Sequence, residues 1–129
     1  MPKRRFNMTV LIVDDAAFVR TVLKNMIQGM GHKVIGEAFN GEDAIKKAKD
    51  LKPHVITMDI VMPKMDGIES VKEILKEQPD TYILMCTAMG QKKMVIKAIM
   101  AGAKDFIVKP FDQGRLEEAL IKCKRQLDV

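Results

Sequence analysis

Aromatic residues are scarce in this chain: its 129 residues include five Phe, one Tyr and no Trp. Proteins that bind single-stranded nucleic acid stack the bases on aromatic side chains beside a groove of Lys and Arg. The net charge is +5, but Lys3, Arg4 and Arg5 supply +3 of it and leave +2 for the remaining residues. We therefore expect no nucleic-acid partner, because a short basic tail is not a clustered basic face.

Long apolar runs and a cysteine framework are also missing. No run approaches the roughly 18 apolar residues of a membrane span, and the start MPKRRFN lacks the apolar core of a signal peptide. Cys86 and Cys123 have neither metal-ligand spacing nor a secretory context, so we expect two reduced thiols. These absences predict a cytoplasmic protein without membrane association.

Apolar residues instead follow a regular alternation of strand and helix patterns. Short continuous runs typical of buried parallel strands alternate with stretches in which apolar residues recur at helical spacing. We expect five strands, at 8–13, 33–38, 54–58, 81–86 and 104–108. Each strand is followed by one helix, and these helices are expected at 19–30, 44–51, 68–75, 91–101 and 116–127.

This alternation predicts an α/β fold: a doubly wound, five-stranded parallel sheet with five flanking helices. The flavodoxin-like strand order 2-1-3-4-5 fits best, with its switch point between the first and third strands. We expect one domain at 8–129, preceded by a basic tail at 1–7.

Polar residues stand where four of these strands end. Asp14 and Asp15 follow the first strand, Asp59 the third, Thr87 the fourth and Lys109 the fifth. A lone Asp or Thr there is more often a helix cap, and a lone Lys is usually only solvated. Parallel α/β sheets bind ligands beyond the carboxyl ends of their strands, so the coincidence at four strands favours a shared site.

Three carboxylates at one edge need a counter-ion. At a separation of about 5 Å, each pair repels by roughly 3 kcal/mol at an effective dielectric near 20. Carboxylate oxygens with open water positions suit Mg²⁺, which binds one or two carboxylates together with phosphate oxygens. We expect a site that brings a phosphoryl group to a carboxylate nucleophile, with Lys109 and Thr87 stabilising the phosphoryl charge.

Three other classes of protein share part of this pattern. A flavodoxin has the same fold, but Asp14 and Asp15 would repel a flavin phosphate. A haloacid-dehalogenase-type phosphatase also phosphorylates an Asp, but it needs a second Asp two residues later, and position 61 is Val. A nucleic-acid-binding module could act only through the basic tail.

The segments LIVDDAAFVR, TMDIVMPKMDG, CTAMG and AGAKDFIVKPF resemble those of response-regulator receiver domains. The resemblance runs nearly end to end and includes the single-domain chemotaxis regulators of non-enteric bacteria and archaea. It implies a phosphorylation-activated regulator of a two-component system, acting on the flagellar or archaellar motor switch or its adaptor. The alternative is a stand-alone receiver that serves as a phosphorelay intermediate or acts outside motility.

The resemblance also implies a role for each residue at the edge. Asp59 would be the phosphoacceptor, charged by a histidine kinase or a small phosphodonor. Mg²⁺ would be held by Asp15, Asp59 and the backbone carbonyl of Val61, and through water by Asp14. The chain would be a signalling protein that catalyses only its own phosphorylation and dephosphorylation.

The same resemblance implies a switch. Lys109 would pair with the phosphoryl group, and its bond to Pro110 would be cis. Thr87 would hydrogen-bond a phosphoryl oxygen, and its movement would leave space into which Phe106 turns. The output surface would be the fourth helix, fifth strand and fifth helix of a monomer without an output domain.

Partners of that surface follow from its composition. Methionines in the fourth helix suit an adaptable binding surface, although simple core packing explains them about as well. Lysines at 92, 93, 97 and 122 would favour an acidic or mixed partner, namely a motor switch protein or adaptor. A histidine kinase of the chemotaxis type and a phosphatase are further expected partners.

Three positions depart from the enteric pattern. Phe106 replaces a common Tyr, so its inward state must depend on packing alone. Val61 and Met89, each two residues past an expected site residue, replace positions that are often polar. Because neither side chain can orient an attacking water, we expect slow spontaneous dephosphorylation.

Overall fold

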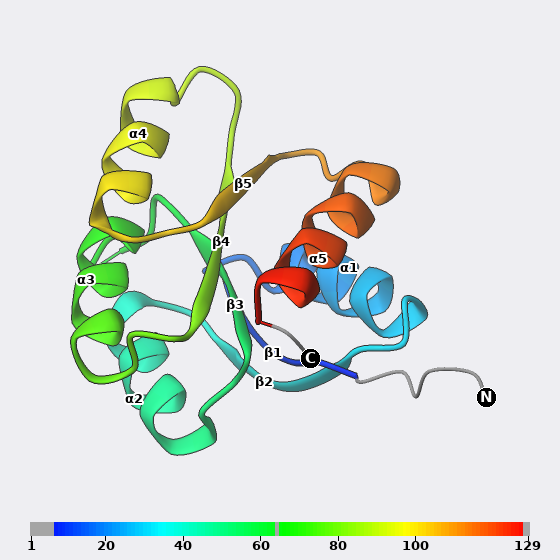
Figure 1. Cartoon of the computed structure of the whole chain (residues 1–129). Coiled ribbons are helices and arrows are strands. Elements are labelled where there is room, and N and C mark those ends of the chain that lie inside the picture. Colours follow the sequence, from blue (N-terminus) through cyan, green and yellow to red (C-terminus); the bar gives the residue numbers. More distant parts are fainter. Residues whose placement is uncertain (1–6, 64, 128–129) are drawn as a thin grey trace.

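The computed structural model describes residues 7–63 and 65–127, which form a parallel sheet between two layers of helices (Figure 1). The strands pair in the order β2-β1-β3-β4-β5, and every pair is parallel. Their bounds are β1 (Thr9–Val13), β2 (Lys33–Ala38), β3 (Val55–Asp59), β4 (Tyr82–Thr87) and β5 (Asp105–Val108). The predicted fold class and strand order are confirmed, whereas residues 1–6 of the predicted tail lie outside the described residues.

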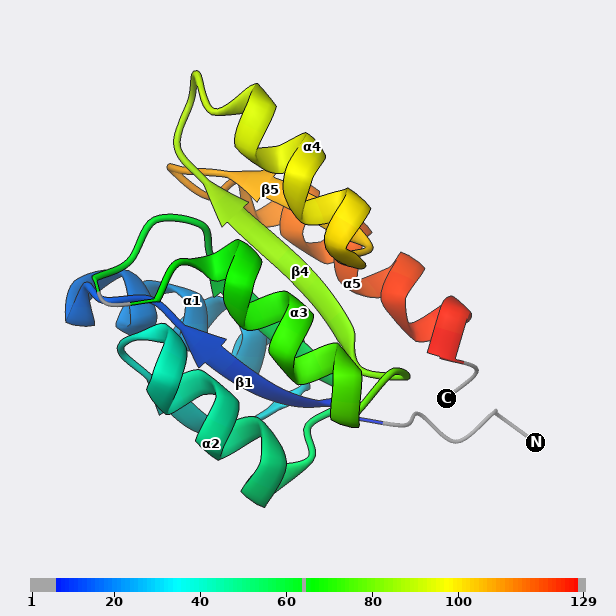
Figure 2. The ribbon, with the colours of Figure 1, turned by 90° about the vertical axis from the view of Figure 1, so that its left-hand side faces the viewer.

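The helices divide between the two faces of the sheet (Figures 1 and 2). Helices α1 (Ala17–Gly29) and α5 (Gln113–Leu127) cover one face. The other face is covered by α2 (Gly41–Leu51), α3 (Gly67–Glu77) and α4 (Lys92–Ala101). Within the described residues, no helix combines the length and apolar character needed to cross a membrane.

Strand β1 is covered by both helix layers. Val10 and Ile12 pack into the apolar cluster under α1 and α5, and Leu11 and Val13 pack into the cluster under α2, α3 and α4. Successive side chains of a strand point to opposite faces, so burial on both sides requires a continuous apolar run. This packing fixes β1 in the middle of the sheet, and with it the position of Asp14 and Asp15, which follow the strand.

The strand ends differ slightly from the sequence prediction. Asp59 and Thr87 are the last residues of β3 and β4, rather than the first residues after them. The sheet pairing continues through them, because Asp59 lies opposite Cys86 and Thr87 lies opposite Val108. Both polar side chains are therefore held by the sheet itself.

Helix α3 starts in close contact with the end of β3. Asp66 caps it by accepting a hydrogen bond from the Glu69 amide at 2.9 Å. The Gly67 amide donates to the Ile60 carbonyl at 2.8 Å, and a Cβ atom at Gly67 would lie 2.2 Å from the Asp59 carbonyl oxygen. Only glycine allows this approach without a backbone shift.

We therefore expect Gly67→Ala to destabilise the protein by about 2 kcal/mol or more, because the added methyl must displace backbone. Gly29→Ala is the matched control, since a Cβ at Gly29 meets no atom within 4 Å. Ala is favoured over Gly in helices, so this variant should be as stable as the wild type or slightly more stable. Urea unfolding followed by circular dichroism measures both, and equal midpoints for the two variants would contradict the close contact.

Candidate functional site

The carboxyl edge of the sheet brings the three predicted carboxylates together. Asp14 follows β1 and is buried, Asp15 is exposed beside it, and the buried Asp59 ends β3. One carboxylate oxygen from each lies within 4.8 Å of those of the other two. The predicted proximity of these residues is confirmed.

Lys109 reaches the same cluster from the end of β5. Its Nζ lies 2.8 Å from Oδ2 of Asp14 and 3.3 Å from Oδ1 of Asp59. Burial alone would lower the pKa of Lys109, but the hydrogen bond to Asp14 and the charges of Asp59 and Asp14 outweigh it and raise the pKa. Lys109 is therefore a cation, and its bond to Pro110 is cis, as the resemblance implies.

One lysine does not balance the charge at Asp59. Burial, followed by the negative charge of Asp14, raises the pKa of Asp59 from 3.8 to about 6, against the opposing effect of Lys109. The cluster consists of hard oxygen donors, and exposed Asp15 leaves it open to water. These properties fit a small hard cation, so the acidic pocket could hold a metal ion.

Thr87 lies at this edge, but its hydroxyl is bonded elsewhere. The buried Oγ1 of Thr87 lies 3.0 Å from Oε1 of Gln91 and 3.1 Å from the Ala88 carbonyl oxygen, so its single proton is directed at these two acceptors. In the part of the chain that the structure describes, no hydrogen bond joins Thr87 to the carboxylates or to Lys109. Among the described residues, the Thr87 hydroxyl is therefore not hydrogen-bonded to the cluster of carboxylates and Lys109.

Phe106 on β5 faces outward, with 38% of its surface exposed. Beside it lies an apolar hollow of about 490 Å³ between β5 and the start of α4. The residues that line the hollow include Thr87, Gln91, Val95, Ile96, Phe106 and Val108. The predicted switch residues therefore share one cavity.

Two supporting residues were not predicted from the sequence. Arg20 on α1 donates from Nη1 to the Asp14 carbonyl at 2.7 Å and from Nε to Oε1 of Glu37 at 3.0 Å. Glu37 lies on β2, a different element from Arg20, so no local sequence pattern could identify the contact between them. Gln91 stands directly before α4, where a polar residue is ordinarily interpreted as a helix cap.

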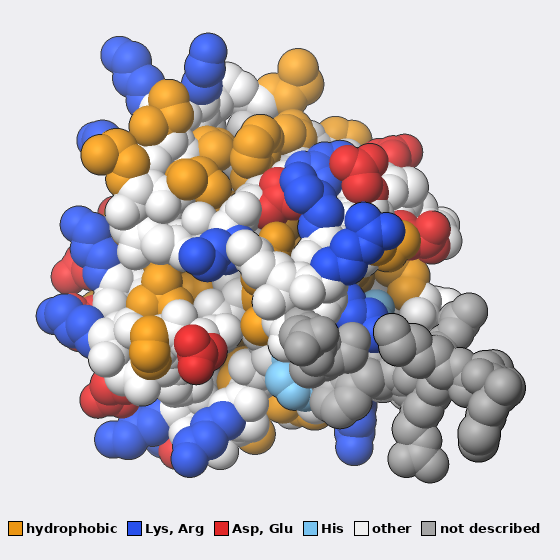
Figure 3. Space-filling model, in the orientation of Figure 1, with side chains coloured by type: hydrophobic (Ala, Val, Ile, Leu, Met, Phe, Trp, Pro, Cys, Tyr) orange, Lys and Arg blue, Asp and Glu red, His pale blue; other side chains and the backbone are white. Residues whose placement is uncertain are grey.

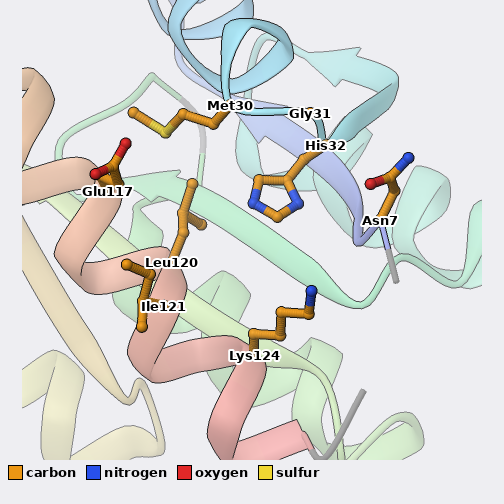
Figure 4. A pocket seen from close by; sticks show the side chains of 8 residues that line it. All are labelled: Asn7, Met30, Gly31, His32, Glu117, Leu120, Ile121 and Lys124. Atoms are coloured by element: carbon orange, nitrogen blue, oxygen red, sulfur yellow. The ribbon is translucent and has the colours of Figure 1, made fainter. Parts of the chain in front are cut away.

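Another hollow, of about 460 Å³, lies at the opposite end of the sheet between α1 and α5 (Figure 4). His32, Glu117 and Lys124 line it, and Nδ1 of His32 accepts a hydrogen bond from the Met8 amide at 3.3 Å. Burial, followed by the charge of Lys124, lowers the pKa of His32. Because it contains none of the clustered carboxylates, this hollow is not the candidate site.

Comparisons with known proteins agree with this geometry. Residues 10–121 match the family model for the response regulator receiver domain. The chain is 58% identical over 116 residues to the chemotaxis protein CheY of Thermotoga maritima, which covers 90% of this chain and 97% of that protein.

Two solved structures give the same result. The response regulator domain of Thermotoga maritima CheB superposes with a TM-score of 0.84 and 40% identity, over 96% of this chain and 98% of that one. A chain in the CheX-CheY-BeF3-Mg²⁺ complex from Borrelia burgdorferi gives a TM-score of 0.85 and 34% identity, over 89% of this chain and 87% of that one.

The charge imbalance at Asp59 predicts that Asp59→Asn stabilises the metal-free protein. A raised pKa means that folding favours the protonated carboxyl, so its contribution to stability is lost as the pH rises through about 6. Asn does not ionise, and we expect it to raise the free energy of unfolding by about 2 kcal/mol near pH 7.5 and by little near pH 4.

Urea unfolding in EDTA at the two pH values measures this difference. Asp50→Asn, at an exposed carboxylate on α2, is the control and should change little. A stabilisation of Asp59→Asn that is equal at both pH values, or that appears only in acid, contradicts the charge imbalance.

Proposed function

This chain belongs to the response regulator receiver domain family, and we propose that it is a phosphorylation-activated chemotaxis regulator of the CheY type. The observation that carries the proposal is the cluster of Asp14, Asp15 and Asp59 with Lys109 at the carboxyl edge. The chain covers 97% of the Thermotoga CheY, so the likeness extends to a whole chemotaxis protein. A phosphorelay intermediate outside motility is not favoured, because several relatives at 49% to 58% identity are CheY chemotaxis proteins.

Asp59 is the proposed phosphoacceptor. Its carboxylate would attack the phosphorus of a phosphohistidine or a small phosphodonor and form an acyl phosphate, while the bond from phosphorus to the donor nitrogen or oxygen breaks and the donor leaves. Lys109, already within 3.3 Å of Asp59, would pair with a phosphoryl oxygen and oppose the growing negative charge. Its position supports this role without a rearrangement of β5.

Mg²⁺ is the proposed metal. Asp15, Asp59 and the backbone carbonyl of Val61 would hold it, and Asp14 would hold it through water. When bound, it would supply positive charge to the phosphoryl oxygens. The oxygen donors of the cluster and the exposure of Asp15 support this choice.

The proposed switch begins at Thr87. Once Asp59 is phosphorylated, the Thr87 hydroxyl would turn to a phosphoryl oxygen, and Phe106 would move into the hollow between β5 and α4. The volume of about 490 Å³ beside the outward ring supports such a movement. A local change of charge would thereby alter the surface of α4 and β5.

The proposed output surface consists of α4, β5 and α5. Figure 3 shows hydrophobic side chains gathered over α4 and β5 with basic side chains at their edge. Ile96, Ile99 and Met100 are exposed there, whereas Val95 and Ala98 are buried. Exposed lysines at 92, 93, 97 and 122 support an acidic or mixed partner, proposed to be a motor switch protein or its adaptor.

A chemotaxis-type histidine kinase and a phosphatase complete the proposed set of partners. A similar solved chain comes from a CheX-CheY complex, which supports a protein partner for this fold. The proposal places the protein in the cytoplasm, where a soluble kinase domain would reach Asp59.

Incubation with acetyl phosphate and Mg²⁺ tests the central role of Asp59. We expect intact-protein mass spectrometry to show the gain of one phosphoryl group, and Asp59→Asn and EDTA each to abolish it. Asp50→Asn, at an exposed carboxylate on α2, should be labelled like the wild type. Equal labelling of Asp59→Asn would contradict the proposed phosphoacceptor.

The apolar positions near Asp59 predict slow loss of the phosphoryl group. Val61 and Met89 have 54% and 82% of their surface exposed; the Val61 side chain has no acceptor for an attacking water, and the Met89 sulfur is only a weak one. We expect Val61→Asn with Met89→Glu to accelerate dephosphorylation by about tenfold, because a positioned polar group assists water attack.

The decay of phosphorylated protein after removal of the phosphodonor gives this rate. Ile121→Asn, at an exposed apolar residue of α5, is the control and should leave the rate unchanged. A wild-type lifetime of seconds that the double substitution does not shorten would refute the role of these positions.

A further inference from the structure

The Thr87 hydroxyl is bonded to Gln91 in this structure. Oγ1 of Thr87 lies 3.0 Å from Oε1 of Gln91 and 3.1 Å from the Ala88 carbonyl oxygen. A hydroxyl has a single proton to donate. Thr87 therefore cannot keep this bond to Gln91 and also donate fully to a phosphoryl oxygen on Asp59.

Gln91 occupies the position that would ordinarily cap α4, but it does not cap the helix. No side-chain hydrogen bond from Gln91 satisfies the first turn of α4, whereas Asn40 and Asp66 each cap the helix that follows them. The Gln91 side chain is instead used by Thr87, at the end of β4.

The first turn of α4 is also unfavourable in charge. It contains Lys92 and Lys93 and no acidic residue. Positive side chains at a helix N-terminus oppose the helix dipole, so this turn gains little stability from its own sequence. The hydrogen bond between Thr87 and Gln91 consequently links the carboxyl edge of the sheet to the weakly stabilised first turn of α4.

We propose that Gln91 is a positioning residue that holds Thr87 in its resting orientation, so that phosphorylation must break their bond and thereby releases the first turn of α4. The inference depends on the proposed function, because it assumes that Thr87 turns toward Asp59. Gln91 and Thr87 line the same hollow as Phe106, so release occurs next to the ring that is expected to move. The bond lowers activation without phosphate and couples Asp59 to the output surface.

Beryllofluoride, a phosphoryl mimic, tests the proposal when its binding is titrated at saturating Mg²⁺ by ¹⁹F NMR. Gln91→Met keeps the length of the side chain but replaces its amide by a weak acceptor. In this variant the hydrogen bond from Thr87 to residue 91 no longer competes with a bond from Thr87 to beryllofluoride. We therefore expect it to bind beryllofluoride about three- to tenfold more tightly than the wild type. Gln113→Met, at an exposed residue of α5, is the matched control and should bind like the wild type.

The Thr87→Ala background separates the proposed link from a general structural effect. Without the Thr87 hydroxyl there is no bond to break, so Gln91→Met should no longer change the affinity for beryllofluoride. The affinity for Mg²⁺ alone should be the same with and without Gln91→Met, since Gln91 has no hydrogen bond to the carboxylates in the described residues.

Each outcome has a definite meaning. Tighter binding by Gln91→Met that disappears in the Thr87→Ala background supports the link. Unchanged binding by Gln91→Met, or an equal gain in both backgrounds, overturns the link and leaves the proposed function intact. A wild type that binds no beryllofluoride overturns the proposed function and the link together.

Discussion

Uncompensated negative charge at the carboxyl edge of the sheet is the constraint on which the rest of this structure depends. Three carboxylates lie within 4.8 Å of one another, and Lys109 is the cation bonded to two of them. Burial and the negative charge of Asp14 together outweigh Lys109 and raise the pKa of Asp59 to about 6. Such a site costs folding free energy, and binding of the proposed cation would offset that cost.

The remainder of the fold divides into a part that holds this charge in place and a part that responds to it. Burial of β1 on both faces, the close contact at Gly67 and the hydrogen bond from Arg20 hold the acidic residues. On the other side of the site, α4 has no side-chain cap and an apolar hollow separates it from Phe106. An acidic half held by packing and backbone contacts therefore adjoins a half with space to rearrange, as the proposed switch requires.

Much of this could be predicted from the sequence, because the determining features are local patterns. Apolar runs and helical periodicity predicted the strand order, and that order alone predicted that Asp14 and Asp59 would meet. The bonds from Thr87 to Gln91 and from Arg20 to Asp14 could not be predicted, since both depend on side-chain rotamers and on neighbouring elements. For the same reason the sequence predicted Thr87 at the site but not its resting partner.

A titration of the phosphate-free protein with Mg²⁺, followed by backbone amide NMR, measures most directly whether the acidic cluster binds a cation. We expect saturable shifts centred on the amides near Asp14, Asp15, Asp59 and Lys109, and an affinity that Asp15→Asn reduces by about tenfold or more. Absence of saturable binding, or shifts centred at the opposite end of the sheet near His32, would contradict the claim that the uncompensated charge at this edge serves to bind a cation.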